Sequence, residues 1–307
     1  MSPVQAPEST LPSRPFSGKD PFLLMDRAAF LPRLNARACL VRHRLADHPL
    51  LALPRLLELA QWLPREHVDL DSGKVPGNDA AEQIPGSDPS VEESFRRIAD
   101  GDLRIMLKRI ELHPEYRELL HSCLAEIESL GHPCTRGVRA REGYVLISPP
   151  NRIIPYHIDP EINFVLQVRG REVYHVLPGD DRALLAEEEI EQFYAGRPQP
   201  VTFREEARPR ATLFELTPGS GIHLPVNYPH WVTIGDEVTI SFALLLQTAG
   251  TKRRGTIYAV NHYLRRAGLK PVPFGRSAVR DFLKYQSFRL WRGLRWCLPW
   301  RRSGSAH

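Results

Sequence analysis

A run of short strand-forming segments between Cys134 and Thr248 constrains the fold of this chain more than any other feature. The segments are separated by proline and glycine and span residues 137–150, 163–179, 200–207, 210–225 and 230–248. They do not alternate with helices, as the strands of a parallel sheet would, and one helix alone, over 181–196, interrupts them. The pattern therefore predicts a mainly β antiparallel sandwich or barrel of the jelly-roll type, flanked by helices.

The segments on either side of this run have helical patterns. Apolar residues recur at helical spacing over 53–63, a Ser-x-x-Glu capping pattern begins at Ser90, and an amphipathic segment over 113–131 ends at a glycine. We therefore expect four regions: a disordered Pro/Ser-rich tail, an N-terminal helical and mixed layer, the barrel and a basic helical region. Their bounds are 1–20, 21–133, 134–250 and 251–307.

Composition and motifs exclude several classes of protein. The 42% hydrophobic and 25% charged residues are typical of a soluble globular protein, and the apolar runs are too short to span a bilayer. No signal-peptide pattern opens the sequence, so a cytoplasmic location is expected. The four cysteines lack a CxxC spacing, which argues against a zinc knuckle or a disulfide framework. No P-loop, GxGxxG motif or nucleophile elbow occurs.

A histidine and an acid two residues apart, His157 and Asp159, are the strongest candidates for metal ligands. On a strand, residues i and i+2 point to the same face, so both side chains could reach one ion. His230, between two strand-forming segments, is the candidate third ligand. Two imidazoles and one carboxylate on one side of an ion leave adjacent positions open, an arrangement typical of non-haem Fe(II) and oxygen chemistry.

Residues 144–179 and 219–232 resemble the JmjC/cupin-like Fe(II)- and 2-oxoglutarate-dependent oxygenases. The pattern of the asparaginyl hydroxylase that acts on a hypoxia-responsive transcription factor fits well, and the flanking residues 47–64 and 264–284 further resemble bacterial cupin-like proteins. His230 lies five residues after Pro225, as in that family. The residues in register after His157 are Asn163, Phe164, Gln167, Arg169 and Gly170.

The resemblance implies an iron- and 2-oxoglutarate-dependent dioxygenase with a double-stranded β-helix core. It implies Fe(II) held by His157, Asp159 and His230, with O2 and 2-oxoglutarate as co-reactants. Hydroxylation of a protein or peptide side chain, or of a small molecule, is the implied reaction. Asn163 matches a residue that contacts the cosubstrate in the family. Arg169 and Arg171 are further candidates for cosubstrate binding.

The sequence departs from the family pattern at the expected cosubstrate end. Glu172 stands where a lysine pairs with the distal carboxylate of 2-oxoglutarate, while Ile154 and Ala243 replace a threonine and an asparagine. A substitute cation could come from several positions, and the sequence does not choose among them. These are Arg152, Arg169, Arg171, Lys252 and Arg253.

Other residues are expected near the site without binding the metal. Tyr156, Glu172 and His223 are predicted to line the pocket, whereas His175 is predicted to be structural. A cupin-fold protein that binds a metal or ligand without turnover is the alternative function. A metal-dependent cupin enzyme without a 2-oxo acid is a third hypothesis.

The C-terminal region carries the net positive charge of the chain. Residues 252–302 hold fourteen Lys or Arg and one acid, Asp281. Aromatic and aliphatic residues recur every three positions from Phe282 to Leu294, interleaved with Lys and Arg, which predicts a basic amphipathic helix. Packing, including homodimerisation through C-terminal helices, is favoured over contact with an anionic membrane surface, and nucleic acid is the least favoured partner.

Overall fold

The computed structural model describes residues 4–5, 20–71, 90–100, 103–197 and 201–297. Most of the tail predicted to be disordered, 1–20, lies outside these residues. The chain divides into two compact units. The first contains Met1–Leu184 and Phe203–Ala249, and the second contains Leu185–Thr202 and Gly250–His307.

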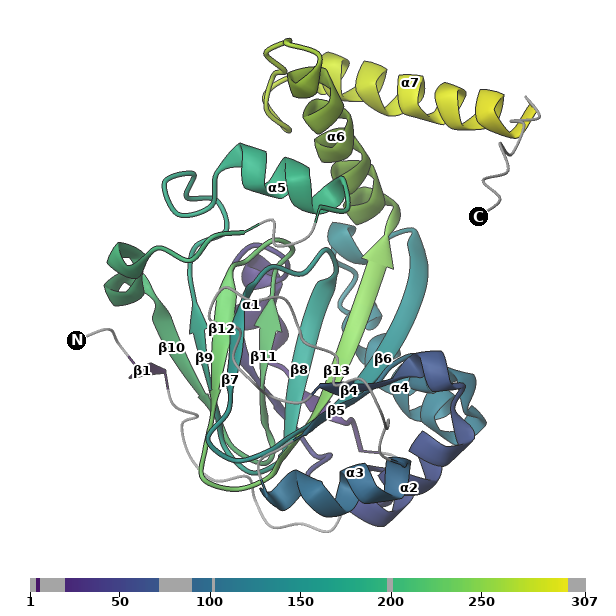
Figure 1. The fold of residues 1–307 in the computed structure, drawn as a ribbon, viewed down its shortest axis with the longest axis vertical. Helices are drawn as coiled ribbons and strands as arrows, with labels where there is room; N and C mark the ends of the chain where they lie inside the picture. Colours follow the sequence, from purple (N-terminus) through teal and green to yellow (C-terminus); the bar gives the residue numbers. More distant parts are fainter. Residues whose placement is uncertain (1–3, 6–19, 72–89, 101–102, 198–200, 298–307) are drawn as a thin grey trace, which may run out of the picture. The chain divides into compact units, whose positions relative to one another are not determined.

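The first unit contains two β-sheets that face each other (Figure 1). The smaller sheet has the order β1 (Val4–Gln5), β10 (Thr212–Leu216), β9 (Glu172–Val176), β12 (His230–Ile234) and β7 (Ile153–His157). The larger has the order β2 (Leu23–Leu24), β3 (Cys39–His43), β11 (Ser220–Leu224), β8 (Ile162–Arg169), β13 (Thr239–Thr248), β6 (Val138–Ser148), β5 (Arg104–Leu107) and β4 (Val68–Asp71). Apart from the short β1–β10 pair, neighbouring strands are antiparallel, which confirms the predicted jelly-roll class.

The central strands of the larger sheet are buried on both faces. In β8, Phe164 and Leu166 belong to the core under the helices, whereas Val165 between them belongs to the core between the sheets. β13 repeats this alternation with Phe242 and Ala243. Because successive side chains of a strand point to opposite faces, the even positions of β8 support the helical layer and the odd positions face the second sheet.

Helices cover the outer face of the larger sheet. They are α1 (Arg27–Phe30), α2 (Leu53–Trp62), α3 (Val91–Arg97) and α4 (Pro114–Ser129). Short 3-10 helices join them at Leu31–Arg33, Pro49–Leu51, Arg65–His67, Ile98–Asp100, Ile110–Leu112 and Pro133–Thr135, and another lies at Glu205–Arg210. Apolar residues of α2 and α4, such as Leu56 and Leu120, join the β8 and β13 side chains in one core.

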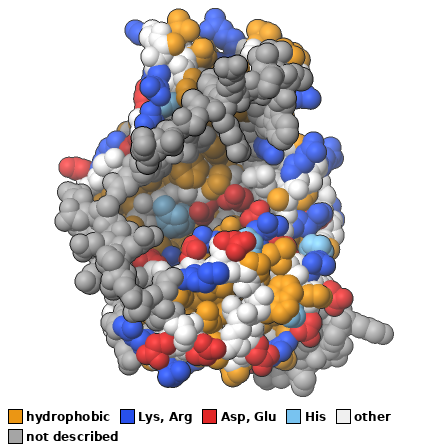
Figure 2. Space-filling model, turned by 45° about the vertical axis from the view of Figure 1, so that its right-hand side comes forward, with side chains coloured by type: hydrophobic (Ala, Val, Ile, Leu, Met, Phe, Trp, Pro, Cys, Tyr) orange, Lys and Arg blue, Asp and Glu red, His pale blue; other side chains and the backbone are white. Residues whose placement is uncertain are grey.

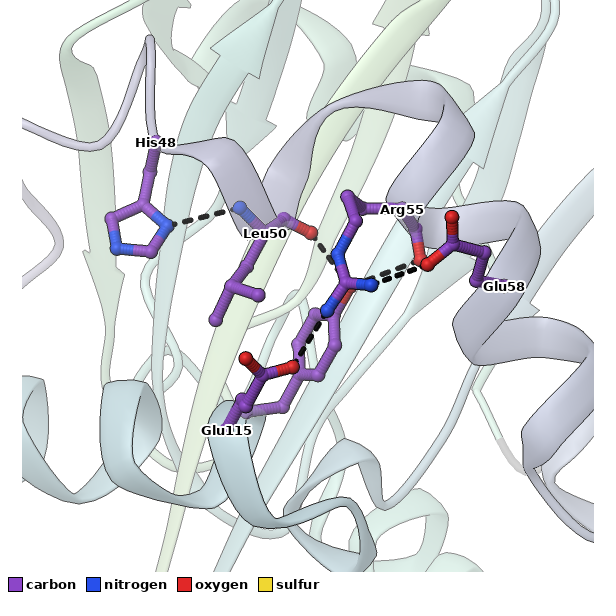
Figure 3. A network of polar contacts seen from close by, with 6 residues as sticks. His48, Leu50, Arg55, Glu58 and Glu115 are labelled. Atoms are coloured by element: carbon purple, nitrogen blue, oxygen red, sulfur yellow. Dashed lines mark hydrogen bonds and ion pairs between the residues drawn. The ribbon is translucent and has the colours of Figure 1, made fainter.

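Polar contacts fix α2 against α4 (Figure 3). The buried Tyr116 hydroxyl donates to the Leu50 carbonyl at 2.7 Å, just before α2 begins. At the surface, Arg55 of α2 pairs with Glu58 on its own helix and with Glu115 of α4 at 2.6 Å. The buried hydroxyl specifies the helix pairing more strongly than the exposed ion pairs do.

Helix α3 begins where the capping pattern predicts it. The Ser90 hydroxyl accepts a hydrogen bond from the Glu93 backbone N–H at 3.2 Å. The α-helix ends at Arg97 and continues as a 3-10 turn through Asp100.

The second unit contains α5 (Glu187–Tyr194), α6 (Ala249–Arg266) and α7 (Ala278–Cys297). The Arg265 guanidinium of α6 binds the buried Glu191 carboxylate of α5 through two hydrogen bonds of 2.9 and 3.1 Å. The Tyr194 and Tyr258 rings stack with their centroids 5.6 Å apart. Gly255 lies beneath Tyr194, where a Cβ would approach the ring to 2.5 Å, so the packing of α5 on α6 requires a glycine there.

Helix α5 begins later than the helix predicted over 181–196. The Ala186 N–H donates to the Glu189 carboxylate at 2.8 Å, and this cap starts the helix at Glu187. The residues before it form turns, in which the Asp181 side chain accepts from the Ala183 N–H. Within the described residues, no helix has the length and apolar content needed to cross a bilayer.

Candidate metal centre

Strand pairing brings the two candidate histidines together. His157 ends β7 and His230 begins β12, and the two are direct partners in the antiparallel ladder. A register shift follows at the next position of β12. The imidazole centroids are 4.2 Å apart although 73 residues separate them in the chain.

Asp159 lies in the loop after β7 and faces both histidines. Its carboxylate oxygens are 4.0 Å from His157 Nε2 and 3.8 Å from His230 Nε2. The Asp159 carbonyl accepts from the Asn227 N–H at 2.9 Å, which anchors the loop. The Asn163 amide donates to Asp159 Oδ2 at 3.0 Å, which orients the carboxylate.

Backbone carbonyls fix the tautomer of each histidine. His157 Nδ1 is 2.7 Å from the Pro155 carbonyl, and His230 Nδ1 is 2.9 Å from the Tyr228 carbonyl. A carbonyl oxygen can only accept, so each Nδ1 carries the proton and each Nε2 presents a lone pair. Both lone pairs lie on the side of Asp159, the arrangement that metal-binding histidines use.

The electrostatics favour metal-binding protonation states for His230 and Asp159. Burial lowers the pKa of His230 to about 4, so its imidazole is neutral. Burial alone would raise the pKa of Asp159, but the two neighbouring histidines and the Asn163 hydrogen bond together lower it. The cluster therefore contains a neutral imidazole at His230 and a carboxylate at Asp159.

This donor set fits a divalent transition metal. The three ligand atoms lie within 4.8 Å of one another. Ligand atoms bound at about 2.0–2.2 Å to one ion are about 3–4 Å apart, so only small side-chain movements are needed. Two imidazoles and one carboxylate on one side suit an ion with open positions facing the cavity.

A cavity of about 400 Å³ opens between the sheets beside this cluster. Its lining comes from β5, β6, β8 and β13 on one side and from β7, β9 and β12 on the other. Figure 2 shows histidine and acidic side chains gathered in a hollow of the surface. Ile154 and Ala243, the positions where the sequence departs from the family pattern, line the cavity, as do Tyr144 and Tyr174.

Glu172 lines the cavity and is almost completely buried. The hydroxyls of Thr239 and Ser241 lie 2.7 and 3.0 Å from its Oε1. Burial raises the pKa of Glu172, although those two hydroxyls and the charge of Arg104 oppose the rise. The neutral carboxyl is therefore favoured compared with an exposed glutamate.

Some residues predicted at the cavity line it and others do not. Tyr156 and Asn163 join Glu172 among the lining residues. Arg169 is exposed, and Arg171 is ion-paired with Glu215 at 2.8 Å; neither lines the cavity.

His223 does not line the cavity as the sequence predicted, because it lies on the opposite face of the larger sheet. Its Nε2 accepts from the Asn35 N–H at 2.8 Å, so its Nδ1 donates to the Asn163 carbonyl at 3.0 Å. Its ring packs against Phe30 and Phe164. The alternation of side chains in β11 could have predicted this position, because the adjacent Ile222 and Leu224 face the space between the sheets.

His175 has the structural position that the sequence predicts. Its ring stacks on Trp231 with the centroids 4.5 Å apart and an angle of 8° between the planes. Cys39, Cys123 and Cys134 are free thiols, as their spacing indicates.

Arg104 and Tyr174 are lining residues that the sequence reasoning missed. The Tyr174 ring stacks beside His230 at 6.0 Å and continues the cavity wall toward Glu172. Both belong to strand segments in which alternate residues share a face, but the alternation alone does not show which face meets the cavity.

No protein-family model matches the chain, and no curated protein matches it. Among solved structures, the ribosomal oxygenase YcfD from Escherichia coli is similar at a TM-score of 0.48 and 15% identity, over 88% of this chain and 67% of that one. The same protein in complex with cobalt and 2-oxoglutarate gives 0.47 and 16%, with the same coverage.

The dimethylsulfoniopropionate (DMSP) lyase DddQ from Ruegeria pomeroyi DSS-3 gives a TM-score of 0.23 at 16% identity, over 35% of this chain and 39% of that one. The fold of this chain is therefore assigned from its own strand pairing rather than from these similarities.

Proposed function

We propose that this protein is an Fe(II)- and 2-oxo-acid-dependent oxygenase that hydroxylates a C–H bond. The cluster of His157, Asp159 and His230 at the wall of a cavity between two sheets carries the proposal. In the overall reaction, one atom of O2 enters the substrate, and the other enters the carboxylate formed as the 2-oxo acid loses CO2. Iron held by the three residues would supply the activation of O2.

The protein's own residues position and shield this chemistry. The Asn163 amide and the two backbone carbonyls hold the ligands in one orientation, which lowers the reorganisation needed on binding. Apolar lining residues such as Val232 and Leu245 exclude water from the inner cavity. A protein or peptide side chain is the proposed substrate class, with a small molecule as the second choice.

Anaerobic titration of the protein with Fe(II) and 2-oxoglutarate tests this function. A weak visible charge-transfer band is expected when both are present, and it should disappear in His157→Ala. Oxygen uptake should require 2-oxoglutarate. Iron binding without that band and without 2-oxoglutarate consumption would instead support a metal-binding protein without turnover. Oxygen uptake independent of a 2-oxo acid would support another type of cupin enzyme.

We also propose that α7 forms a homodimer contact. Val279, Phe282, Leu283 and Leu290 are each at least half exposed and recur at helical spacing along one stripe of α7. A second copy of the helix would bury this stripe. Light scattering should show a dimer that Leu283→Glu with Leu290→Glu converts to monomer; binding of the wild-type monomer to anionic vesicles would favour a membrane surface instead.

A further inference from the structure

Arg104 is the one Lys or Arg among the described residues that line the cavity. It begins β5, in the larger sheet, and faces β9 of the smaller sheet across the cavity. Burial raises the pKa of both Glu172 and Tyr174 on β9, and the Arg104 charge opposes this rise at each residue. The guanidinium is thus close enough to act on the polar end of the cavity.

The described residues give the Arg104 guanidinium no ion pair, and its Nε is buried without a hydrogen-bond partner. Asp71 lies directly opposite Arg104 on β4 and could have been its counter-ion. Instead, the Asp71 carboxylate accepts from Arg152 at 2.5 Å. Because a partly buried cation without a counter-ion is costly, the arrangement favours an anionic ligand in the cavity.

Glu172 forms no ion pair with Arg104 among the described residues. Its Oε1 faces the Thr239 and Ser241 hydroxyls, and burial favours its neutral form. In the neutral form that burial favours, the Glu172 carboxyl leaves the local charge positive and can itself donate a hydrogen bond to a carboxylate. Tyr174 lies between this end of the cavity and His230, so one continuous wall connects the cation to the metal cluster.

We propose that Arg104 pairs with the second carboxylate of a 2-oxo dicarboxylate whose 2-oxo acid end binds at His157, Asp159 and His230. The inference rests on the proposed function and deepens it, because it assigns the cosubstrate class to one side chain. Arg104 replaces the cation that Glu172 cannot supply, from a strand outside the segment in which the sequence places the site. It selects dicarboxylates over 2-oxo monocarboxylates.

Binding calorimetry on the Mn(II)-loaded protein without oxygen tests this assignment directly. The probes are 2-oxoglutarate and 2-oxobutyrate, which share the chelating end and differ in the second carboxylate. The wild type should bind 2-oxoglutarate at least ~10-fold more tightly, the range of one charge-assisted contact. In Arg104→Met, this preference should fall to within about 3-fold, because no charge remains to contact the second carboxylate.

Three controls separate the possible outcomes. Mn(II) affinity, measured by electron paramagnetic resonance, should be unchanged in Arg104→Met, which shows that the cluster is intact. Arg104→Lys keeps the charge and should keep most of the preference, so it replaces the methionine variant if that one does not fold. Arg171→Met removes an arginine paired with Glu215 outside the cavity and should change nothing.

The results distinguish the inference from the function on which it rests. A full dicarboxylate preference in Arg104→Met, with Mn(II) bound, overturns the role of Arg104 and leaves the proposed function standing. If the Mn(II)-loaded wild type binds neither 2-oxo acid, the proposed function fails, and the inference fails with it. Equal wild-type affinity for the two acids overturns the inference alone.

Discussion

His223 should make the stability of the first unit depend on pH between about 4 and 6.5. It is fully buried, and burial lowers its pKa to about 4, from 6.5 in the unfolded chain. Between these values the unfolded state binds a proton that the folded state does not, so stability is present above pH 6.5 and is lost as the pH falls. At 1.36 kcal/mol per pKa unit, the loss approaches ~3.4 kcal/mol at low pH and is about 2 kcal/mol at pH 5.0.

The assay compares urea unfolding of the wild type and His223→Gln at pH 7.5 and pH 5.0, followed by tryptophan fluorescence and circular dichroism. Glutamine can accept from the Asn35 N–H and donate to the Asn163 carbonyl, yet it does not titrate. The wild type should lose about 2 kcal/mol more than the variant between the two pH values. His43, whose pKa burial also lowers to about 4, contributes equally to both proteins and cancels. A difference below about 0.5 kcal/mol would refute the reasoning.

Three further substitutions probe packing and pairing. Tyr116→Phe removes the hydroxyl that donates to the Leu50 carbonyl and should cost ~1 kcal/mol in thermal unfolding, whereas no loss would show that the hydroxyl does not specify the contact. Gly221→Ala places a Cβ 2.5 Å from the Val165 carbonyl and should cost about 1–3 kcal/mol, measured by urea unfolding; a neutral result contradicts the close approach of β11 to β8. Arg265→Met leaves the Glu191 carboxylate buried without its cation and should destabilise α5 on α6 by about 2–3 kcal/mol, seen as faster hydrogen exchange in α5, while Arg265→Lys should lose less.

The candidate metal cluster was accessible from sequence because its parts are local patterns. His157 and Asp159 are two residues apart, and the position of His230 after Pro225 followed from a resemblance. The β7–β12 pairing that joins them depends on contacts 73 residues apart, so the residues alone indicated candidates rather than a geometry. The jelly-roll class was predictable because the strand pattern and the absence of a βαβ rhythm both follow from local residue types.

The other residues of the candidate site could not be predicted, because their positions depend on which face of each strand meets the cavity. His223 was expected in the pocket because it lies in the strand-forming segment before Pro225, but the alternation of side chains in β11 places it under the helices. Arg104 was missed because its strand lies far from the metal motif in sequence and joins the sheet through β6. Among the arginines proposed as substitute cations, Arg152 is ion-paired with Asp71, and Arg171 is ion-paired with Glu215.

The pairing of His157 with His230 also bears on the edge of the smaller sheet. β7 is the last strand of that sheet, and β12 is its only neighbour within the sheet as described. An ion held by one residue from each strand and by the loop after β7 would tie the border strand to the interior. The same ligands that bring a reactive ion to the cavity would then restrain the strand most prone to fraying and to pairing with another chain.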